Sequence, residues 1–356
     1  MRIKSYRGEY EVCFTRDYVA ELRERLRPGD WLLLDEKVAG LYADALAPFR
    51  ESHPWVVIPP GEPSKSYAAA GDLISRLIEG GFKRNNRLVA IGGGIVQDAV
   101  AFAASIIYRG IQWVFVPTTL LAQGDSCIGS KTSVNFGEYK NMLGGFHPPC
   151  EIVIDPSFLK TLDEREIRSG LGEMSHFFLI GGRADFELVR DNYDACLQDV
   201  GATLKLTERS LQIKKDMIER DEFDRGPRKI FNYGHSFGHA LESYTHYRIP
   251  HGIAVSYGMD LANRVSVQLG LLDQTVFEEA RDFLQKIWQG SPVGDVDIDE
   301  YVGLLAKDKK NVSAKLNLVI TRGFGDMFLQ QVEPDAAFFE SVRECFEHFR
   351  TLVPQN

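Results

Sequence analysis

Short apolar runs alternate with helix-like patterns along the first part of the chain. The apolar runs lie at 31–34, 55–58, 87–91, 113–116 and 152–155. Segments with the spacing of a helix that buries one face lie between them, at 18–27, 66–80 and 97–108. This alternation is typical of parallel strands connected by helices. We therefore predict that residues 1–155 form an α/β domain.

The pattern changes after Pro156. Strand-like runs become rare, and amphipathic helices are predicted at 163–180, 204–220, 238–244, 254–269, 274–289, 298–307 and 336–349. One late apolar segment, 316–320, could be a strand. The sequence thus predicts a second, helical domain over residues 156–356, with the boundary set by the change of pattern alone.

Length and composition agree with two folded domains. The chain has 356 residues, and a domain usually takes roughly 100–200. Hydrophobic residues make up 44% and charged residues 26%, far from the signature of a disordered chain. The formal net charge is −9, which argues against a nucleic acid as partner. A local cluster of cations could still bind an anionic small molecule.

The cysteines and the apolar stretches point to the cytoplasm. The five cysteines are scattered and odd in number, without a CxxC pair, so neither a disulfide framework nor a thiolate zinc site is indicated. The first residues, MRIKSYRGEYEV, lack the apolar core of a secretory signal. The longest apolar stretches, such as 99–108, are too short to cross a bilayer. We expect a cytoplasmic protein with no membrane partner.

A glycine turn in the first half is the candidate nucleotide site. The apolar run at 87–91 leads through Gly92, Gly93 and Gly94 into a helix. Glycines let backbone amides approach a pyrophosphate, and the helix N-terminus favours negative charge. The segment is not the GxGxxG fingerprint, so a tight turn without a ligand explains it equally well. Asp35, at the end of one predicted strand, could bind ribose hydroxyls, and Thr118 and Thr119, after another, could bind phosphate.

Histidines in the second half are candidate metal ligands. His235 and His239 lie four residues apart, on one face if the segment is helical, and His251 follows. Such a pair can bind a metal ion, although it also occurs as a plain surface or capped pair. A catalytic site needs about three protein ligands and an open position. Glu173, which lies between glycines that would let another element approach closely, is the candidate carboxylate, and His176 lies one turn further.

Further charged and polar residues suit a phosphorylated substrate. Several lie in glycine-rich, turn-like segments where a charge has no evident structural purpose, although any one of them could be a simple surface charge. They are Arg109, Asp125, Lys131, Lys140, Asn141, Lys214, Arg228, Lys309 and Lys310.

These motifs together resemble the sugar phosphate cyclases, the superfamily of 3-dehydroquinate synthase. The resemblance covers nearly the whole chain in order. It rests on GEPSKS (61–66), GGGIVQD (92–98), YRG (108–110), VPTTLLAQGDSCIGSKTSVN (116–135), KNMLGGFHPP (140–149), SGLGE (169–173), Lys214, DEFDRGPR (221–228), NYGHSFGHALE (232–242), HG (251–252) and DKK (308–310).

The resemblance implies a Rossmann-like N-terminal domain that binds NAD and an all-α C-terminal domain that binds zinc or cobalt, with the active site in the cleft between them. It implies that Glu173, His235 and His251 are the metal ligands, and that His239 is an active-site residue instead of a ligand. The positions it assigns to NAD are Asp35, Glu62, Lys65, Gly93, Gly94, Asp98, Thr118, Thr119, Asp125, Lys131 and Lys140.

The remaining site residues implied by the resemblance concern the substrate. Catalytic positions correspond to Asp125, Lys131, His176, Lys214, Arg228, Asn232 and His239. Positions that bind the substrate phosphate correspond to Arg109, Asn141, Lys309 and Lys310. In the family, the residue at the position of Arg109 reaches the neighbouring subunit's site, so a homodimer is implied.

The implied reaction converts a heptulosonate 7-phosphate into a carbocycle through transient oxidation by NAD, loss of phosphate, re-reduction and aldol closure. One departure from the family pattern is His176, where the family has a lysine; an unperturbed imidazole is mostly neutral at pH 7. Lys214, Arg228 and Asn232 are retained and favour a substrate with a carboxylate.

Three alternatives remain open at this point. One is a specialised cyclase acting on an amino analogue, sedoheptulose 7-phosphate or glucose 6-phosphate, for which His176 is the motivating difference. Another is a metal-dependent polyol or alcohol dehydrogenase that releases NADH. The last is a catalytically idle paralogue. The retention of nearly all polar pocket residues argues against this alternative.

Overall fold

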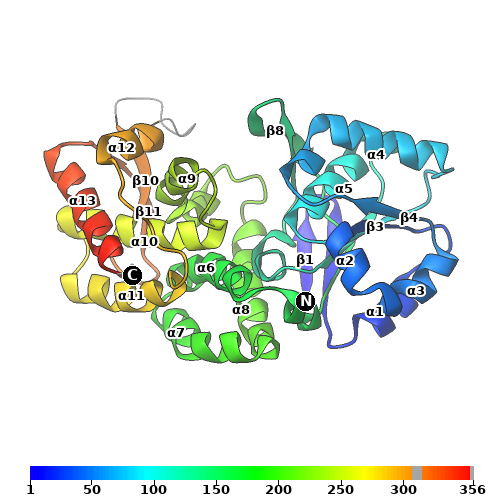
Figure 1. The fold of residues 1–356 in the computed structure, drawn as a ribbon, viewed down its shortest axis with the longest axis horizontal. Coiled ribbons are helices and arrows are strands. Elements are labelled where there is room, and N and C mark those ends of the chain that lie inside the picture. Colours follow the sequence, from blue (N-terminus) through cyan, green and yellow to red (C-terminus); the bar gives the residue numbers. More distant parts are fainter. Residues whose placement is uncertain (307–314, 353–356) are drawn as a thin grey trace. The chain divides into compact units, whose positions relative to one another are not determined.

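A computed structural model describes residues 1–306 and 315–352. The chain divides into two compact units, which are described separately (Figure 1). The first comprises Met1–Leu162 and Thr203–Phe223, and the second comprises Asp163–Ala202 and Asp224–Asn356. No helix within the described ranges is long and apolar enough to cross a membrane.

The first unit is built on a seven-stranded sheet in the order β1-β2-β9-β6-β5-β3-β4. Only the β1–β2 pair is antiparallel, and all other neighbours run parallel. Every residue of the central strands β5 and β6 is buried, as expected for a parallel sheet covered on both faces. The strands are β1 (Arg2–Ser5), β2 (Gly8–Phe14), β3 (Trp31–Asp35), β4 (Trp55–Ile58), β5 (Leu88–Gly92), β6 (Trp113–Pro117) and β9 (Glu151–Ile154).

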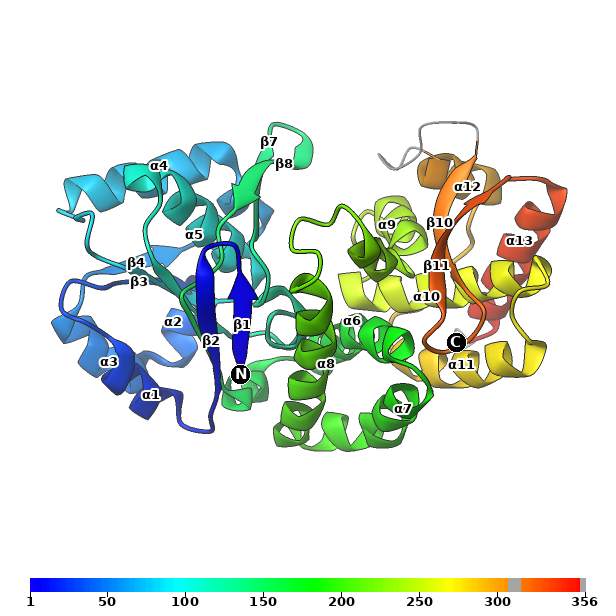
Figure 2. The same cartoon turned by 180° about the vertical axis from the view of Figure 1, so that it is seen from behind.

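Helices cover both faces of this sheet (Figure 2). Alternate strand residues point to opposite faces. Leu33 and Ala90 join a core with side chains of α4, α5 and α8, whereas Leu32 and Val89 join a core with side chains of α1, α2 and α3. The elements are α1 (Tyr18–Arg25), α2 (Glu36–Leu41), α3 (Ala43–Ser52), α4 (Tyr67–Glu79), α5 (Gly94–Ile106), α8 (Thr203–Ile218) and a hairpin of β7 (Lys131–Phe136) and β8 (Tyr139–Phe146).

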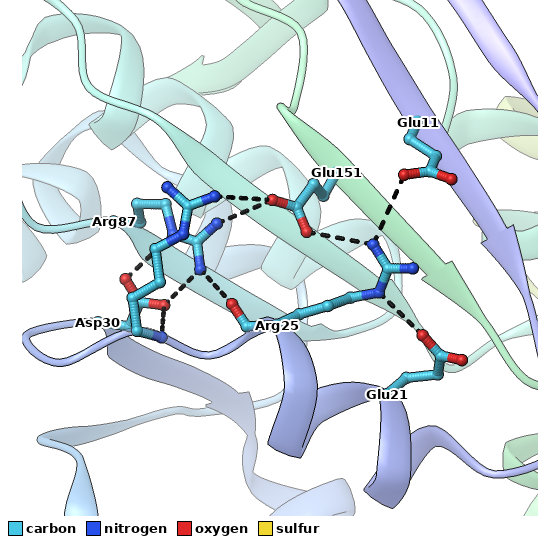
Figure 3. A network of polar contacts seen from close by, with 7 residues as sticks. Glu11, Glu21, Arg25, Asp30, Arg87 and Glu151 are labelled. Carbon is cyan, nitrogen blue, oxygen red and sulfur yellow. Dashed lines mark hydrogen bonds and ion pairs between the residues drawn. The ribbon is translucent and has the colours of Figure 1, made fainter.

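A buried polar network ties the amino ends of the parallel strands together (Figure 3). Arg87, which precedes β5, donates to both carboxylate oxygens of Asp30 at 3.1 and 2.6 Å and to Glu151 at 2.9 Å. Arg25 at the end of α1 also pairs with Glu151, at 3.4 Å. Breaking such a buried pair leaves an uncompensated charge. Ligands of open α/β sheets bind at the opposite, carboxyl ends of the strands.

Helix α8 belongs to the first unit although it follows two helices of the second. Leu211 and Ile218 lie in the core under the sheet, and the Ser210 hydroxyl donates to the carbonyl oxygen of Gly124 at 2.8 Å. The chain pattern divides the sequence once, at residue 155. The compact units instead divide after Leu162, and the later segment Thr203–Phe223 belongs to the first unit again.

The second unit packs its helices around α10, whose residues are buried on nearly every side. A helix that is apolar all round is a central one. The two-stranded antiparallel sheet of β10 and β11 adds to this unit, and β10 contains the strand predicted at 316–320. The elements are α6 (Glu164–Gly181), α7 (Arg183–Gln198), α9 (His235–Tyr244), α10 (His251–Gln268), α11 (Gln274–Ile287), α12 (Ile298–Ala306), β10 (Leu316–Thr321), β11 (Met327–Val332) and α13 (Ala336–Thr351).

Short helical segments connect these elements. They are η1 (Glu62–Lys65), η2 (Ile107–Arg109), η3 (Ala122–Ser126) and η4 (Pro156–Thr161) in the first unit, and η5 (Val200–Ala202) and η6 (Pro227–Asn232) in the second.

Candidate functional site

Glycines bring the backbones of α6 and α10 into contact. A Cβ atom added to Gly252 would lie 1.8 Å from the carbonyl oxygen of Ser169, and one added to Gly172 would lie 2.3 Å from that of Gly252. Only glycine allows this approach. The expectation that another element packs against the glycines beside Glu173 is met. Glu173 on α6 and His251 at the start of α10 are thereby brought together.

A second glycine contact brings α9 against α10. A Cβ atom added to Gly258 would lie 1.9 Å from the carbonyl oxygen of Gly234. Gly234 has a φ of 77°, a left-handed conformation that favours glycine, and α9 starts at the next residue, His235. The first residues of α9 and α10 are therefore placed by two backbone-to-backbone contacts instead of by flexible side chains.

Glu173, His235 and His251 form a cluster of metal-ligating atoms. One atom from each lies within 4.8 Å of the other two. The Nε2 atom of His235 lies 3.3 Å from Oε1 of Glu173, and that of His251 lies 3.3 Å from Oε2. Two ligands at 2.0–2.1 Å from a tetrahedral zinc ion are about 3.3 Å apart. Among the residues described, Oε2 of Glu173 is buried and has no hydrogen-bond partner.

The hydrogen bonds of the two imidazoles also suit a cation. Nδ1 of His235 lies 3.2 Å from the carbonyl oxygen of Tyr233, and Nδ1 of His251 lies 3.0 Å from Oε2 of Glu242. Both partners only accept, so each favours the ring tautomer with the proton on Nδ1 and the lone pair on Nε2, the nitrogen that faces Glu173. The donor set therefore fits a divalent metal ion.

Electrostatics around Glu173 support the same arrangement. Burial alone would raise the pKa of this carboxyl, but the facing imidazoles of His235 and His251 hold the pKa well below its usual range. Burial would likewise raise the pKa of Glu242, and its hydrogen bond with His251 lowers it instead. Both groups are thus carboxylates at neutral pH.

His239 and His176 flank this cluster. His239 is not in the group with Glu173. It forms a second group of metal-ligating type with Glu242 and His251. His176 is buried one turn after Glu173, with Nδ1 2.5 Å from the carbonyl oxygen of Glu173 and its ring centroid 5.0 Å from that of His235. An imidazole, and not a lysine cation, therefore lies next to the ligands.

Arg228 and Asn232 lie on η6 of the same unit. Arg228 is 7% exposed, and the Asn232 side chain donates to the carbonyl oxygen of Lys229 at 2.9 Å. The ring of Phe231, between them on η6, lies 6.1 Å from that of His176. The structure thus brings η6 up to the ligand cluster. Lys309 and Lys310, predicted to bind phosphate, lie outside the described residues.

In the first unit, the predicted nucleotide residues gather at the carboxyl ends of β3, β5 and β6. Gly93 caps α5 without a side-chain bond, and a Cβ atom there would lie 2.9 Å from Cγ2 of Thr119. A Cβ atom on Gly94 would meet no described atom within 4 Å, which leaves the helix N-terminus accessible to an anion. The amide of Thr118 donates to the carbonyl oxygen of Gly92. Asp35 caps α2, accepting from the amide of Lys37 at 2.9 Å.

The other predicted NAD residues connect η1, α5 and the β7–β8 hairpin. Nζ of Lys65 lies 2.5 Å from Oδ2 of Asp98, and burial raises the pKa of Asp98. Glu62 accepts from the side chain of Asn135 at 2.8 Å, and Asn135 accepts from the amide of Asn141 at 2.9 Å. Asn135 lies in the block VPTTLLAQGDSCIGSKTSVN, which resembles the family, but nothing about an asparagine at this position indicated a function in the sequence. Lys131 and Lys140 lie on the two strands of the same hairpin.

Lys214 and Asp125 form a largely buried ion pair in the first unit. Nζ of Lys214, on α8, lies 2.8 Å from Oδ1 of Asp125, on η3, and 2.8 Å from its carbonyl oxygen. The side chains are 8% and 19% exposed. The residues are 89 positions apart in the sequence, so only the packing of α8 into this unit shows that they meet.

Arg109 lies on a strained turn. Tyr108, Arg109 and Gly110 all have positive φ, with values of 49°, 67° and 108°. The first two are unfavourable for residues with a side chain. Buried His147 contacts this turn through Nε2, which donates to the carbonyl oxygen of Ile111 at 2.7 Å. Sequence reasoning missed His147, whose only signal was its place in the block KNMLGGFHPP.

Sequence reasoning also missed Glu242. It lies seven residues after His235, which is two helical turns and therefore the same face of α9. That spacing was the available signal, but it became useful only once the segment was known to be helical from His235 onward.

Two family models match consecutive parts of this chain. The model of the 3-dehydroquinate synthase N-terminal part matches residues 55–169, and that of the C-terminal part matches residues 170–311. The 3-dehydroquinate synthase of Alkaliphilus metalliredigens (strain QYMF) is 35% identical over 326 residues, covering 90% of this chain and 92% of that protein.

Two solved structures have the same fold. The 2-epi-5-epi-valiolone synthase of Streptomyces hygroscopicus subsp. jinggangensis 5008, with NAD+ and Zn2+ bound, is 27% identical with a TM-score of 0.84, over 95% of this chain and 97% of that one. A 2-deoxy-scyllo-inosose synthase complexed with carbaglucose-6-phosphate, NAD+ and Co2+ is 24% identical with a TM-score of 0.87, over 97% and 99%. The predicted fold is confirmed, and the chain belongs to the 3-dehydroquinate synthase family of sugar phosphate cyclases.

Proposed function

We propose that this protein is an NAD- and metal-dependent cyclase of the 3-dehydroquinate synthase type, a carbon–oxygen lyase. Its substrate is 3-deoxy-D-arabino-heptulosonate 7-phosphate, and its products are 3-dehydroquinate and phosphate. The observation that carries the proposal is the cluster of Glu173, His235 and His251, whose facing atoms have the spacing of ligands on one tetrahedral ion. Relatives with bound NAD+ and Zn2+ or Co2+ support it.

The two cofactors would be held by different units. We assign the metal ion to Glu173, His235 and His251 of the helical unit. We assign NAD to the carboxyl ends of the strands in the α/β unit, where the N-terminus of α5 starts at Gly94. When bound, NAD supplies reversible hydride transfer, and zinc or cobalt supplies Lewis-acid polarisation of a substrate oxygen.

The chain's own residues bind and orient the substrate. Arg228 offers a rigid fork of donors to a carboxylate, and Asn232 on the same short helix adds an amide. Lys214 is held by two contacts with Asp125, so its cation is oriented before a substrate arrives. This preorganisation reduces the entropy lost on binding.

Further residues act on the phosphate and on protons. Asn141, Lys309 and Lys310 would bind the phosphate, and His239, beside His235 and His251, would exchange a proton with a substrate hydroxyl. Arg109 would reach the site of a second subunit, which makes the enzyme a homodimer.

The absence of a paired cysteine motif in the sequence supports a cytoplasmic location.

One observation favours a second candidate, a specialised cyclase with a different sugar phosphate. His176 is buried beside the ligands, where the family has a lysine. A lysine is a permanent cation, whereas an imidazole is mostly neutral at pH 7. The replacement of the family's lysine by His176 would suit a substrate that does not need a positive charge next to it at this position.

One assay separates these functions. The purified protein would be loaded with zinc, supplied with NAD and given each sugar phosphate in turn, while inorganic phosphate and NADH absorbance are recorded. Phosphate release from the heptulosonate phosphate without NADH accumulation is the expected result. NADH formed in step with turnover would identify a dehydrogenase, and activity on another sugar phosphate alone would identify the specialised cyclase. Replacing His235 with alanine is the matched control, because it removes a proposed ligand.

A further inference from the structure

Glu242 contacts a proposed metal ligand without belonging to the cluster around Glu173. Its Oε2 atom lies 3.0 Å from Nδ1 of His251, and 13% of its side chain is exposed. The residue is on α9, whereas His251 starts α10. The backbones of these helices touch at Gly258 and Gly234, so the position of Glu242 relative to His251 is set by rigid elements.

The imidazole of His251 lies between two carboxylates. Glu242 faces Nδ1 at 3.0 Å, and Glu173 faces Nε2 at 3.3 Å. A neutral imidazole carries one proton, which can be donated to only one of these carboxylates. If the proton is on Nε2, His251 donates to Glu173 and cannot ligate a metal ion through that atom. If it is on Nδ1, Nε2 carries the lone pair that a metal needs.

His235 provides an internal comparison. Its Nδ1 atom faces a backbone carbonyl, that of Tyr233, at 3.2 Å. A carbonyl only accepts and cannot be removed by substitution of a side chain. For His251, the corresponding acceptor is a side chain, and it is charged. A charged acceptor binds the ring proton more strongly than a neutral one and makes the opposite nitrogen more basic.

We propose that Glu242 is a positioning residue that holds the proton of His251 on Nδ1 and thereby makes Nε2 a metal ligand. The inference rests on the proposed metal site and adds a residue that acts on the ion only through His251. Without Glu242, the charged acceptor that favours the Nδ1 tautomer is lost, so the tautomer in which Nε2 donates to Glu173 becomes more populated. Loss of Glu242 would thus weaken metal binding by turning a ligand into a hydrogen-bond donor.

The geometry also allows a different role, which the experiment distinguishes. His239, Glu242 and His251 themselves form a group of metal-ligating type, so Glu242 could be the ligand of a second ion. Such an ion would need Nδ1 of His251, which is at hydrogen-bond distance from Glu242. The hydrogen-bonded role therefore predicts one metal ion per chain, and the ligand role predicts two.

The test measures zinc affinity and stoichiometry of the full chain, not activity. Zinc would be titrated against a chromophoric chelator into the metal-free protein, with Glu242→Ala and Glu242→Gln compared with the wild type. We expect affinity to fall about 10–100-fold for Glu242→Ala. A smaller loss is expected for Glu242→Gln, whose amide oxygen still accepts from Nδ1 but carries no charge. Ser243→Ala, at the neighbouring exposed position of α9, is the matched control and should bind as the wild type does.

Folding and function are separated in the same series. Circular dichroism of the metal-free variants reports whether each is folded. If Glu242→Ala does not fold, the nearly isosteric Glu242→Gln still tests the inference. A folded Glu242→Ala protein with wild-type zinc affinity would overturn the inference while leaving the metal site intact. Two zinc ions per wild-type chain would also overturn it. A wild-type chain that binds no zinc would overturn the proposed function as well.

Discussion

Replacing Gly252 with alanine tests whether helix packing sets the geometry of the side-chain cluster of Glu173, His235 and His251. The new Cβ would lie 1.8 Å from the carbonyl oxygen of Ser169 and 2.7 Å from the amide nitrogen of Glu173. Ordinary contacts of a Cβ atom begin at 3.4 Å, so the backbones must separate by about 1.6 Å, which is 3.4 minus 1.8. Both obstructing atoms belong to the backbone, so no side-chain rotation can relieve the clash and α10 itself has to move.

That movement reaches the cluster directly, because His251 precedes Gly252 in the chain. Metal sites hold ligand distances within about 0.2 Å, several times less than the required shift. We expect the free energy of unfolding to fall by about 1–3 kcal/mol from overpacking. Zinc affinity should fall at least about tenfold, the scale of effect produced by disturbing a ligand's orientation.

The assays are urea unfolding followed by circular dichroism and zinc competition with a chelator. Gly303→Ala is the matched control, because Gly303 lies in helix α12 of the same unit and a Cβ atom there would meet no described atom within 4 Å. This control should gain about 0.5–1 kcal/mol of stability and keep its zinc affinity. If Gly252→Ala were as stable as the wild type and bound zinc as tightly, the packing argument would be refuted.

Three further predictions concern other parts of the chain. Arg87→Met leaves Asp30 buried without its main partner, so urea unfolding should show a loss of about 3–5 kcal/mol at unchanged zinc affinity; unchanged stability would contradict the role of the network. Burial lowers the pKa of His147, so its contribution to stability is complete above about pH 6.5 and is lost as the pH falls through the folded-state pKa. His147→Gln should therefore lose less stability than the wild type on acidification, and an equal loss would refute this. His176→Lys should impair phosphate release from the native substrate if His176 specifies it, whereas faster release from the heptulosonate phosphate would argue against specialisation.

Much of the fold could be read from local patterns. The strand predicted at 55–58 has the bounds of β4, and those at 31–34 and 113–116 fall one residue short of β3 and β6. β3 and β6 are largely buried parallel strands, whose continuous apolar runs are distinct from the surrounding helices. β4 is the edge strand and only partly buried, but its four residues are all apolar. The helices at 66–80 and 274–289 are α4 and α11 with ends that differ by at most two residues, because helix ends depend on capping more than on periodicity.

Elements with little buried surface were not predicted. Strand β8 has no fully buried residue, and the edge strand β1 has only one, Ile3, so neither shows an apolar run. Helices α2 and α3 are short and adjoin each other at Tyr42. The candidate metal ligands and several nucleotide residues were singled out from their residue types and spacing, whereas the other site residues and the individual roles were taken from the family resemblance.

The sequence by itself determined the identities of the candidate ligands and the glycines beside them, the parallel strands and the family. Only the tertiary structure decided that α8 packs under the sheet of the first unit, that the imidazoles of His235 and His251 face the same carboxylate at 3.3 Å, and that Glu242 contacts one of them. The physical reason is that a local sequence pattern reports on contacts between residues close in the sequence, and these contacts join residues far apart in it. Apolar periodicity reports which face of a segment is buried, whereas the contact between Glu173 and His251 depends on how closely two glycine-bearing helices pack, which no local pattern encodes.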